Sequence, residues 1–209
     1  MDNIFGYKIS DSKYPQMKII ETPKFILRPA MLSDANDFFE YLSQEKVVRY
    51  LPFSVHKNIH QTTSFIKSFF IQNYKKGKIG NYAVYYKADR KVIGNVGLNN
   101  IDTNSNEAEI GICINPKYWG HNFATELTII SLITGFELLQ LDKLVALTYT
   151  KNKYTPKSLE TLGFEYIKTY RPTLNSDICH RFELTKSTYL ELKKSYFPNL
   201  LKEFKSSIY

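Results

Sequence analysis

Apolar positions in the first part of the chain alternate between strand-like and helix-like spacing. A short apolar run at Phe25–Pro29 predicts a first strand, and Ser33 after it has the side chain of a helix N-cap. We expect the helix that follows to extend through Leu42. Between His60 and Tyr74 apolar residues recur every three or four positions, which predicts a second, amphipathic helix.

The middle of the chain has the two-residue alternation of a strand meander. Three strands are predicted, at Tyr82–Tyr86, Val92–Leu98 and Ala108–Ile114. A turn at residues 88–91 separates the first two strands. We expect Asn99–Asn106 to form a turn-rich loop before the third strand.

The second half of the chain continues the alternation of helices and strands, which predicts a layered α/β or α+β fold. Thr125–Leu139 has the apolar content of a long buried helix, and a strand follows at Leu144–Tyr149. Thr155–Leu162 is expected to form a short helix that Gly163 ends. The remaining predicted elements are strands at Phe164–Thr169 and Cys179–Leu184 and a last helix from Tyr189 to about Phe197, with Thr188 and Glu191 as its capping box.

Composition adds a domain count and a charge to this pattern. The 209 residues are 43% hydrophobic and 23% charged, a balance typical of one globular domain with a sizeable core. We therefore expect a single domain over residues 1–209. The formal net charge is +8, but the lysines are dispersed and form no block of about five or six like charges. We expect no specific nucleic-acid partner, and an RNA-binding protein with steeply salt-dependent affinity remains a rival class.

Cysteine usage and apolar runs restrict the class further. Cys113 and Cys179 form no CxxC pair and no Cys/His cluster with metal spacing, so we expect no metal and a reducing compartment. No apolar run approaches the roughly 18 residues of a membrane helix. The first ten residues lack a charged start followed by an apolar run, so no signal peptide is expected. These features favour a cytoplasmic monomer or homodimer that does not bind membranes.

The segment with the most chemical information runs from Glu107 to Phe164, and a sharp turn between a strand and a helix lies near its centre. The start of a helix offers unpaired backbone N–H groups and positive potential, which suits a phosphate. Gly120 in this turn would let the backbone approach a phosphate oxygen closely. Taken alone, the turn fits an ordinary helix start equally well.

Four groups of residues follow one another in this segment with a specific order and spacing, and four more lie upstream. The chain resembles the GNAT superfamily of acetyltransferases in these groups, and within it the ribosomal-protein N-terminal (alanine/serine) acetyltransferase branch. The resemblance covers roughly Thr22 to Leu184, so residues 22–185 form a family-like core and residues 186–209 a C-terminal helical extension. The groups are Ala108-Glu109-Ile110-Gly111; Tyr118-Trp119-Gly120 with Phe123-Ala124-Thr125-Glu126; Asn152 with Thr155; Leu162-Gly163-Phe164; and, upstream, Leu27-Arg28-Pro29, Ser33-Asp34-Ala35, Arg49–Pro52 and Ile93–Leu98.

The resemblance implies an α/β (α+β) fold of the GNAT type. Its sheet would be mixed, mostly antiparallel and strongly bent, with about seven strands flanked by helices. It also implies acetyl-CoA as cosubstrate and the transfer of an acetyl group to a primary amine without a metal. The first acceptor that we expect is a protein N-terminal α-amine of the ribosomal-protein type, acetylated by direct transfer. Two alternatives stay open: a small-molecule amine such as an antibiotic, amino sugar or polyamine, and a non-catalytic module that senses acyl-CoA.

The resemblance further implies which residues bind the cofactor. The backbone around Tyr118–Phe123 would hold the CoA diphosphate, with Gly120 at the family's first glycine and Asn122 in place of the second. Asn152 would hold the pantetheine arm, and backbone N–H groups of Ile112–Ile114 would stabilise the oxyanion. The expected cofactor-binding residues are Ile112, Cys113, Ile114, Lys117, Tyr118, Trp119, Gly120, His121, Asn122, Phe123, Ala124 and Asn152.

Two residues are expected to carry the chemistry. Glu109 is the candidate general base, acting through a water, and the strand period places it on one face with Gly111 and Cys113. An exposed glutamate without a role is the alternative. Thr155 stands where this branch has a serine and would donate a hydrogen bond to the departing sulfur; it also fits the N-cap of the short helix. Leu159 occupies the position of a tyrosine that many members of the superfamily use.

Overall fold

A computed structural model describes residues 7–173 and 176–198. The first six residues, part of the loop at 173–177 and the end of the C-terminal extension lie outside the described residues. The chain divides into two compact units: unit 1 holds residues 1–97 and 112–121, and unit 2 holds residues 98–111 and 122–209. No helix among the described residues is long and apolar enough to span a membrane.

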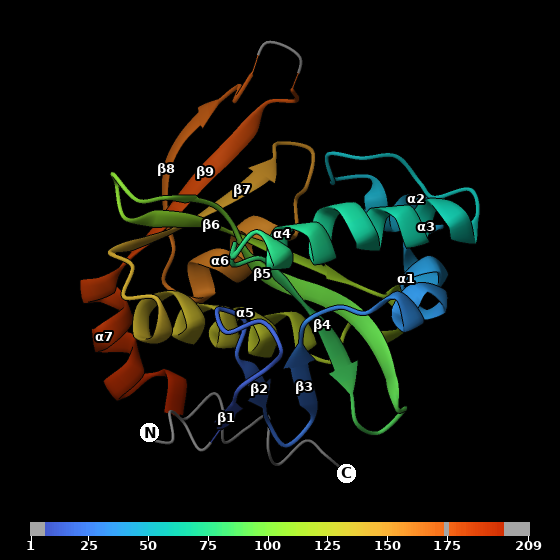
Figure 1. Ribbon diagram of the computed structural model, residues 1–209. Coiled ribbons are helices and arrows are strands. Elements are labelled where there is room, and N and C mark those ends of the chain that lie inside the picture. The colour runs from blue at the N-terminus through green and yellow to red at the C-terminus, as the bar shows by residue number, and fades with distance from the viewer. Residues whose placement is uncertain (1–6, 174–175, 199–209) are drawn as a thin grey trace. The chain divides into compact units, whose positions relative to one another are not determined.

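Unit 1 contains a series of antiparallel strands that starts near the N-terminus (Figure 1). Their order is β1 (Lys8–Ser10), β2 (Ile19–Glu21), β3 (Phe25–Arg28), β4 (Asn81–Tyr86) and β5 (Lys91–Asp102). Each neighbouring pair is antiparallel. The predicted strands at β3 and β4 are confirmed. The strands β1 and β2 were not predicted, because three-residue strands are too short to show alternation.

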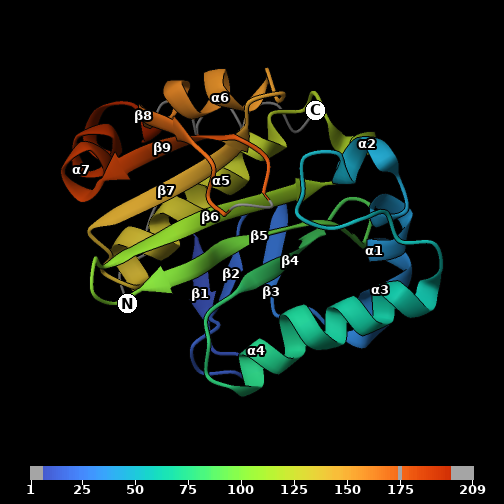
Figure 2. The same ribbon diagram turned by 90° about the horizontal axis from the view of Figure 1, so that it is seen from above.

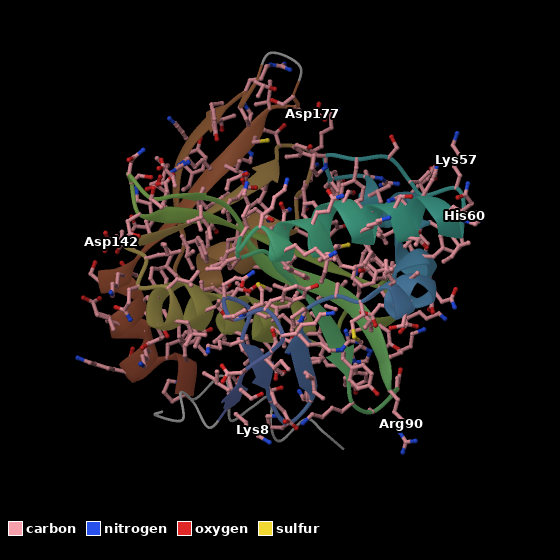
Figure 3. The ribbon with its side chains drawn as sticks, viewed as in Figure 1. Lys8, Lys57, His60, Arg90, Asp142 and Asp177 are labelled. Atoms are coloured by element: carbon pink, nitrogen blue, oxygen red, sulfur yellow. The ribbon has the colours of Figure 1, made fainter. Side chains whose placement is uncertain are left out.

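The helices of unit 1 are α1 (Ala35–Leu42), α2 (Glu45–Val48), α3 (Ile59–Phe65) and α4 (Gln72–Lys75), with the π-helical segment η3 (Ile66–Ile71) between the last two. Figure 2 shows α3, η3 and α4 as one continuous coil, as the sequence predicted for this region. The apolar face of this coil is buried, with Ile66, Phe70 and Tyr74 at most 2% exposed. The polar face is exposed and includes His60 near the start of α3, and Lys57, just before the helix, is exposed as well (Figure 3).

The start of α1 differs from the prediction. Ser33 is not the N-cap but lies inside a short 3-10 turn, η2 (Leu32–Asp34), and the α-helix begins one residue later. Asp34 shapes this start, because its carboxylate accepts the Met31 N–H at 2.8 Å and binds the Arg28 guanidinium at 2.7 and 2.8 Å. The Asp34 carboxylate, and not the Ser33 hydroxyl, therefore fixes the start of this helical segment.

Unit 2 has its strands in the order β6 (Glu107–Ile114), β7 (Lys143–Tyr149), β9 (Cys179–Thr185) and β8 (Glu165–Tyr170). The end of β5, from residue 98, also belongs to unit 2, and the end of β6, from residue 112, belongs to unit 1. The β6–β7 pair is parallel, whereas β7–β9 and β8–β9 are antiparallel. The prediction of mixed, mostly antiparallel strands is thus confirmed. The predicted number of about seven is too low: the described residues contain nine, the additional two being β1 and β2.

One loop of unit 2 is shorter than predicted. The expected loop at Asn99–Asn106 is strand as far as Asp102, because β5 continues through two asparagines that do not fit the apolar alternation. Within unit 2 the pairing of β6 with β7 covers Glu107–Glu109 and ends there, although both strands continue.

The helices of unit 2 are α5 (Phe123–Ile133), the π-helical segment η5 (Thr134–Leu138), α6 (Thr155–Thr161) and α7 (Lys186–Ser195). The start of α7 corrects the prediction that Thr188 and Glu191 form a capping box. Thr185 is the N-cap, and its side chain accepts the Thr188 N–H at 3.3 Å. The helix therefore begins three residues before the expected Tyr189.

Candidate active site

The turn after β6 is anchored by Asn115, which is fully buried in unit 1. Its side-chain oxygen accepts the Lys117 N–H at 3.1 Å, and its amide donates to Glu40 Oε1 of α1 at 3.1 Å. Its backbone N–H donates to the Ile93 carbonyl of β5 at 2.7 Å. Because α1, β5 and the 3-10 turn η4 (Pro116–Tyr118) all meet at this one amide, the start of the loop has a defined conformation.

Glu40 brings two lysines together beside the same turn. Lys117 Nζ lies 2.8 Å from its Oε1, and Lys91 Nζ binds its Oε2. These hydrogen bonds, from Lys117 first and Lys91 second, lower the pKa of Glu40 to about 2. Lys117, an expected cofactor residue, thus has a carboxylate partner that sequence reasoning missed, because Glu40 resembles any glutamate on the polar face of a helix.

Tyr118 and Trp119 hold the middle of the loop by their polar atoms. The Tyr118 hydroxyl donates to Asp89 in the turn between β4 and β5. The Trp119 Nε1–H donates to the Ile114 carbonyl at 2.9 Å, while half of the indole surface stays exposed. This hydrogen bond anchors Trp119 to the end of β6 within unit 1.

Left-handed backbone conformations occur at Gly120 and Asn122. Gly120 has φ +84°, and an added Cβ would meet no described atom within 4 Å, so its glycine is required by the backbone angle and not by crowding. Asn122 has φ +59° at the N-cap position of α5, and its side chain makes no capping bond. Asparagine adopts this region more readily than other non-glycine residues, so it can replace the family's second glycine in the backbone.

The other expected cofactor residues differ in exposure. At the end of β6 in unit 1, Ile112 is half-buried, and Cys113 and Ile114 are buried. His121, also in unit 1, is exposed. In unit 2, Phe123 is buried and Ala124 is exposed in the first turn of α5. Burial raises the pKa of the Cys113 thiol to about 12. A thiol that is neutral near pH 7 is a poor nucleophile, which does not favour a route in which Cys113 first takes the acetyl group from the cofactor.

Glu109 lies half-buried on β6 in unit 2. Asn100 of β5 donates from Nδ2 to Glu109 Oε2 at 2.9 Å. Burial raises the pKa of Glu109, and the Asn100 hydrogen bond and the Arg181 charge oppose that rise. A carboxylate in such a place can accept a proton more readily than an ordinary surface glutamate.

Four charged side chains form a network on the same face of unit 2 as Glu109. Arg181 of β9 donates from Nη2 to both oxygens of Glu107 at 3.0 and 3.1 Å and from Nε to Glu183 at 2.6 Å. Lys143 of β7 lies 2.9 Å from Glu183 and 3.6 Å from Glu107. Strand register explains the shared face, because Glu107 pairs with Lys143 and Glu109 with Val145, whose β9 partner is Glu183.

Asn152 and Thr155, which the sequence placed in the site separately, are bonded to each other in unit 2. Asn152 Nδ2 donates to Thr155 Oγ1 at 2.8 Å, and Asn152 Oδ1 accepts the backbone N–H groups of Tyr154 and Thr155 at 3.2 and 3.3 Å. Thr155 is the first residue of α6 and not its N-cap, which is Tyr154. Since its oxygen accepts from Asn152, the Thr155 hydroxyl keeps its own proton for a further partner.

His56, in the loop before α3, is packed within unit 1. It is 9% exposed, and its Nδ1 lies 2.9 Å from Thr62 Oγ1. Its ring contacts Phe53 and Phe65, and burial lowers its pKa. The described residues contain no group of three or more His, Cys, Asp or Glu side chains that could hold a metal ion.

The chain belongs to the GNAT acetyltransferase family. The family model of the acetyltransferase (GNAT) domain matches residues 24–165. The chain is also 29% identical, over 147 residues, to the uncharacterized N-acetyltransferase YoaA of Bacillus subtilis (strain 168), covering 70% of this chain and 82% of that protein.

Solved structures have the same fold. A GCN5-related N-acetyltransferase from Brucella melitensis has a TM-score of 0.77 at 21% identity, covering 88% of this chain and 86% of that one. The ribosomal-protein-S5-alanine acetyltransferase of Vibrio fischeri has a TM-score of 0.68 at 17% identity, with 82% and 98% covered. The microcin C7 self-immunity acetyltransferase MccE, solved with acetyl-CoA and AMP, has a TM-score of 0.67 at 22% identity, with 78% and 93% covered. The protein is therefore an acetyl-CoA-dependent acyltransferase of the GNAT type.

Proposed function

We propose that the protein acetylates a protein N-terminal α-amine of the ribosomal-protein type by direct transfer, with Glu109 as general base. The observation that carries this proposal is the half-buried Glu109 carboxylate, whose pKa is raised by burial. An α-ammonium group titrates near pH 8 and a lysine ammonium near 10.4. A carboxylate base, even one of raised pKa, therefore has a smaller barrier to overcome with an α-amine than with a lysine.

The residues of the loop fit a diphosphate. Gly120 has open space where a Cβ would lie, and Asn122 leaves the start of α5 without a side-chain cap. Backbone N–H groups and the positive end of the helix dipole suit an anion at such a start. We infer that residues Lys117 to Ala124 hold the diphosphate of acetyl-CoA, which supplies the acetyl group as a thioester.

The remaining assignments concern the arm of the cofactor and its sulfur. The end of the β6–β7 pairing at Glu109 supports a divergence of these strands in which the pantetheine arm would lie. Backbone N–H groups of Ile112–Ile114 would stabilise negative charge on the carbonyl oxygen. Asn152 would hold the arm, and the Thr155 hydroxyl, oriented by Asn152 at 2.8 Å, would donate a hydrogen bond to the departing sulfur.

A small-molecule amine is the second candidate acceptor. It is supported by the similarity in fold to the microcin C7 self-immunity acetyltransferase, whereas the similarity to the Vibrio fischeri ribosomal-protein acetyltransferase supports the first candidate. Family membership favours transfer over a non-catalytic acyl-CoA sensor.

A panel of acceptors tests the proposal. Its members are lysine-free peptides with a free N-terminal alanine or serine, a lysine peptide with a blocked N-terminus, and spermidine, glucosamine and an aminoglycoside. CoA thiol release gives the rate, and mass spectrometry locates the acetyl group. We expect the α-amine peptides to have the highest kcat/KM, by about tenfold or more over the lysine peptide. A faster small amine would establish the second candidate instead.

A further inference from the structure

We propose that Asn100 and Arg181 are positioning residues that aim the Glu109 carboxylate and keep it ionised in its half-buried place. This inference rests on the proposed function, since it gives Glu109 the role of base. It concerns only unit 2, in which all three residues lie.

The backbone of Asn100 is the first observation. Its φ of +49° lies in the left-handed region, although it is inside strand β5. Such conformations are rare for non-glycine residues in strands and occur often at functional sites. Here the unusual backbone accompanies a side chain whose Nδ2 lies 2.9 Å from Glu109 Oε2. One oxygen of the carboxylate therefore has a fixed donor, and the other is left to accept a proton.

The anchoring of Arg181 is the second observation. Its guanidinium is held on two sides, by both oxygens of Glu107 at 3.0 and 3.1 Å and by Glu183 at 2.6 Å. A planar guanidinium with two carboxylate partners has little freedom to move. Glu107 is two residues before Glu109 on the same strand and shares its face. The positive charge that acts on Glu109 is therefore held in place by Glu107 and Glu183, and the ion pairs of Arg181 are with these two carboxylates.

The other described titratable groups around Glu109 in unit 2 do not supply a free positive charge or a donor that would favour the ionised carboxylate in place of Asn100 and Arg181. Lys143 is paired with Glu183 and Glu107. The electrostatic neighbours of Glu109 also include Tyr149 of β7 and Cys179 of β9, and burial raises the pKa of both, so both are neutral near pH 7. The negative charge of Asp177, just before β9, also raises the pKa of Tyr149 and of Cys179. Glu165 of β8 lies opposite Glu183 in the β8–β9 register. Burial raises the pKa of Glu109, and only Asn100 and the charge of Arg181 oppose that rise among the described residues that act on it.

Replacement of Asn100 by glycine tests the first contact. Asn100→Gly removes the amide but keeps a residue that tolerates positive φ. We expect kcat/KM at pH 6 to fall by about threefold to tenfold, with a smaller loss at pH 8.5, because the acid limb of the profile moves to higher pH. Asn106→Gly is the matched control: Asn106 is also left-handed, at φ +48°, and donates to the Asp142 carboxylate at 2.9 Å (Asp142 is labelled in Figure 3). Equal profiles for the two variants would overturn the role of Asn100.

The role of Arg181 is tested by two substitutions with long side chains that differ in charge. Arg181→Lys keeps the positive charge and Arg181→Met removes it, so only the methionine variant should move the acid limb to higher pH. Thermal unfolding identifies a variant that loses its fold. If Arg181→Met does not fold, Arg181→Gln takes its place, because it also removes the charge but can still hydrogen-bond to Glu107. A purely structural role predicts lost stability with an unmoved acid limb in the charge-removing variant.

A titration of the free protein separates this inference from the proposed function. Carbon-13 NMR of the Glu109 carboxyl, assigned with Glu109→Gln, follows its ionisation without any substrate. We expect a higher midpoint in Asn100→Gly and Arg181→Met than in wild type and Asn106→Gly; unchanged midpoints would overturn the inference. Full activity of Glu109→Gln would instead overturn the role of Glu109 as base, and the titration would still show whether Asn100 and Arg181 act on it.

Discussion

The part of the proposed diphosphate loop that lies in unit 1, residues 115–121, and the surroundings of Glu109 in unit 2 are ordered in different ways. The loop has local contacts that shape its backbone, such as Asn115 to Lys117 and Trp119 to Ile114, and it is anchored to α1 by the hydrogen bond from Asn115 to Glu40, 75 positions away. The surroundings of Glu109 bring together side chains from β5, β6 and β9, with up to 74 residues between partners. Under the proposed function, the left-handed backbone angles at the loop belong to Gly120 and Asn122 themselves, whereas the carboxylate of the proposed base depends on side chains from other strands.

The largest expected effect separates chemistry from binding. Glu109→Gln should lower kcat for the α-amine peptide by about 100-fold to 10,000-fold, because general-base catalysis is lost. The Kd of acetyl-CoA, measured by titration calorimetry, should stay unchanged. Glu165→Gln, on the exposed strand β8, is the control with full activity. A loss of acetyl-CoA binding in Glu109→Gln would contradict the division between the two regions.

The next effect concerns the buried anchor of the loop. Asn115→Leu is similar in size but leaves the Lys117 N–H without its acceptor and removes a donor to Glu40. We expect a loss of about 2–3 kcal/mol in the free energy of unfolding, together with weaker acetyl-CoA binding. Chemical denaturation and calorimetry measure the two quantities. Unchanged acetyl-CoA affinity in a folded Asn115→Leu protein would show that this anchor does not serve the loop.

A smaller effect is expected at Gly120, and the chain provides a matched glycine. Gly120 and Gly77 both lie in unit 1 with positive φ, and neither would crowd an added Cβ. Alanine at either position should cost about 1–2 kcal/mol of stability because of the left-handed backbone. Only Gly120→Ala should also raise the Kd of acetyl-CoA. Equal affinities in the two variants would argue against a backbone approach at Gly120.

The smallest effect is a pH dependence of stability at Glu40. Its pKa is about 2 in the folded protein and 4.5 in the absence of its partners. A lowered carboxyl pKa stabilises the fold above pH 4.5, and this contribution disappears as the pH falls toward about 2. Wild type should therefore be more stable than Glu40→Gln at pH 7, and the difference should shrink at low pH. Denaturation curves at several pH values would show a constant difference if the ion pairs contribute nothing.

Much of the fold and of the loop could be predicted from sequence, because both depend on short-range patterns. The helix over His60–Tyr74 and the strand over Ala108–Ile114 follow from periodicity, and Gly120 and Asn122 have the left-handed angles that glycine and asparagine permit. The roles of Asn100, Glu40 and Arg181 could not be predicted. An asparagine in a polar stretch, a glutamate on a helix and an arginine in a strand acquire partners only through strand register and helix packing. Ser33 was wrongly predicted as a helix cap for the same reason: the pairing of Asp34 with Arg28, which sets the start of the helical segment, exists only in the folded chain.

The chain has two cysteines, and each unit contains one of them, buried: Cys113 in unit 1 and Cys179 in unit 2. Burial raises the pKa of both thiols, so a thiol-specific dye should react slowly with the native protein. The rate of labelling at each cysteine then reports how often its own unit opens. With Cys113→Ala and Cys179→Ala as single-site versions, the two labelling rates can be compared with and without acetyl-CoA. The protein thus contains its own pair of reporters for local opening, one for each unit.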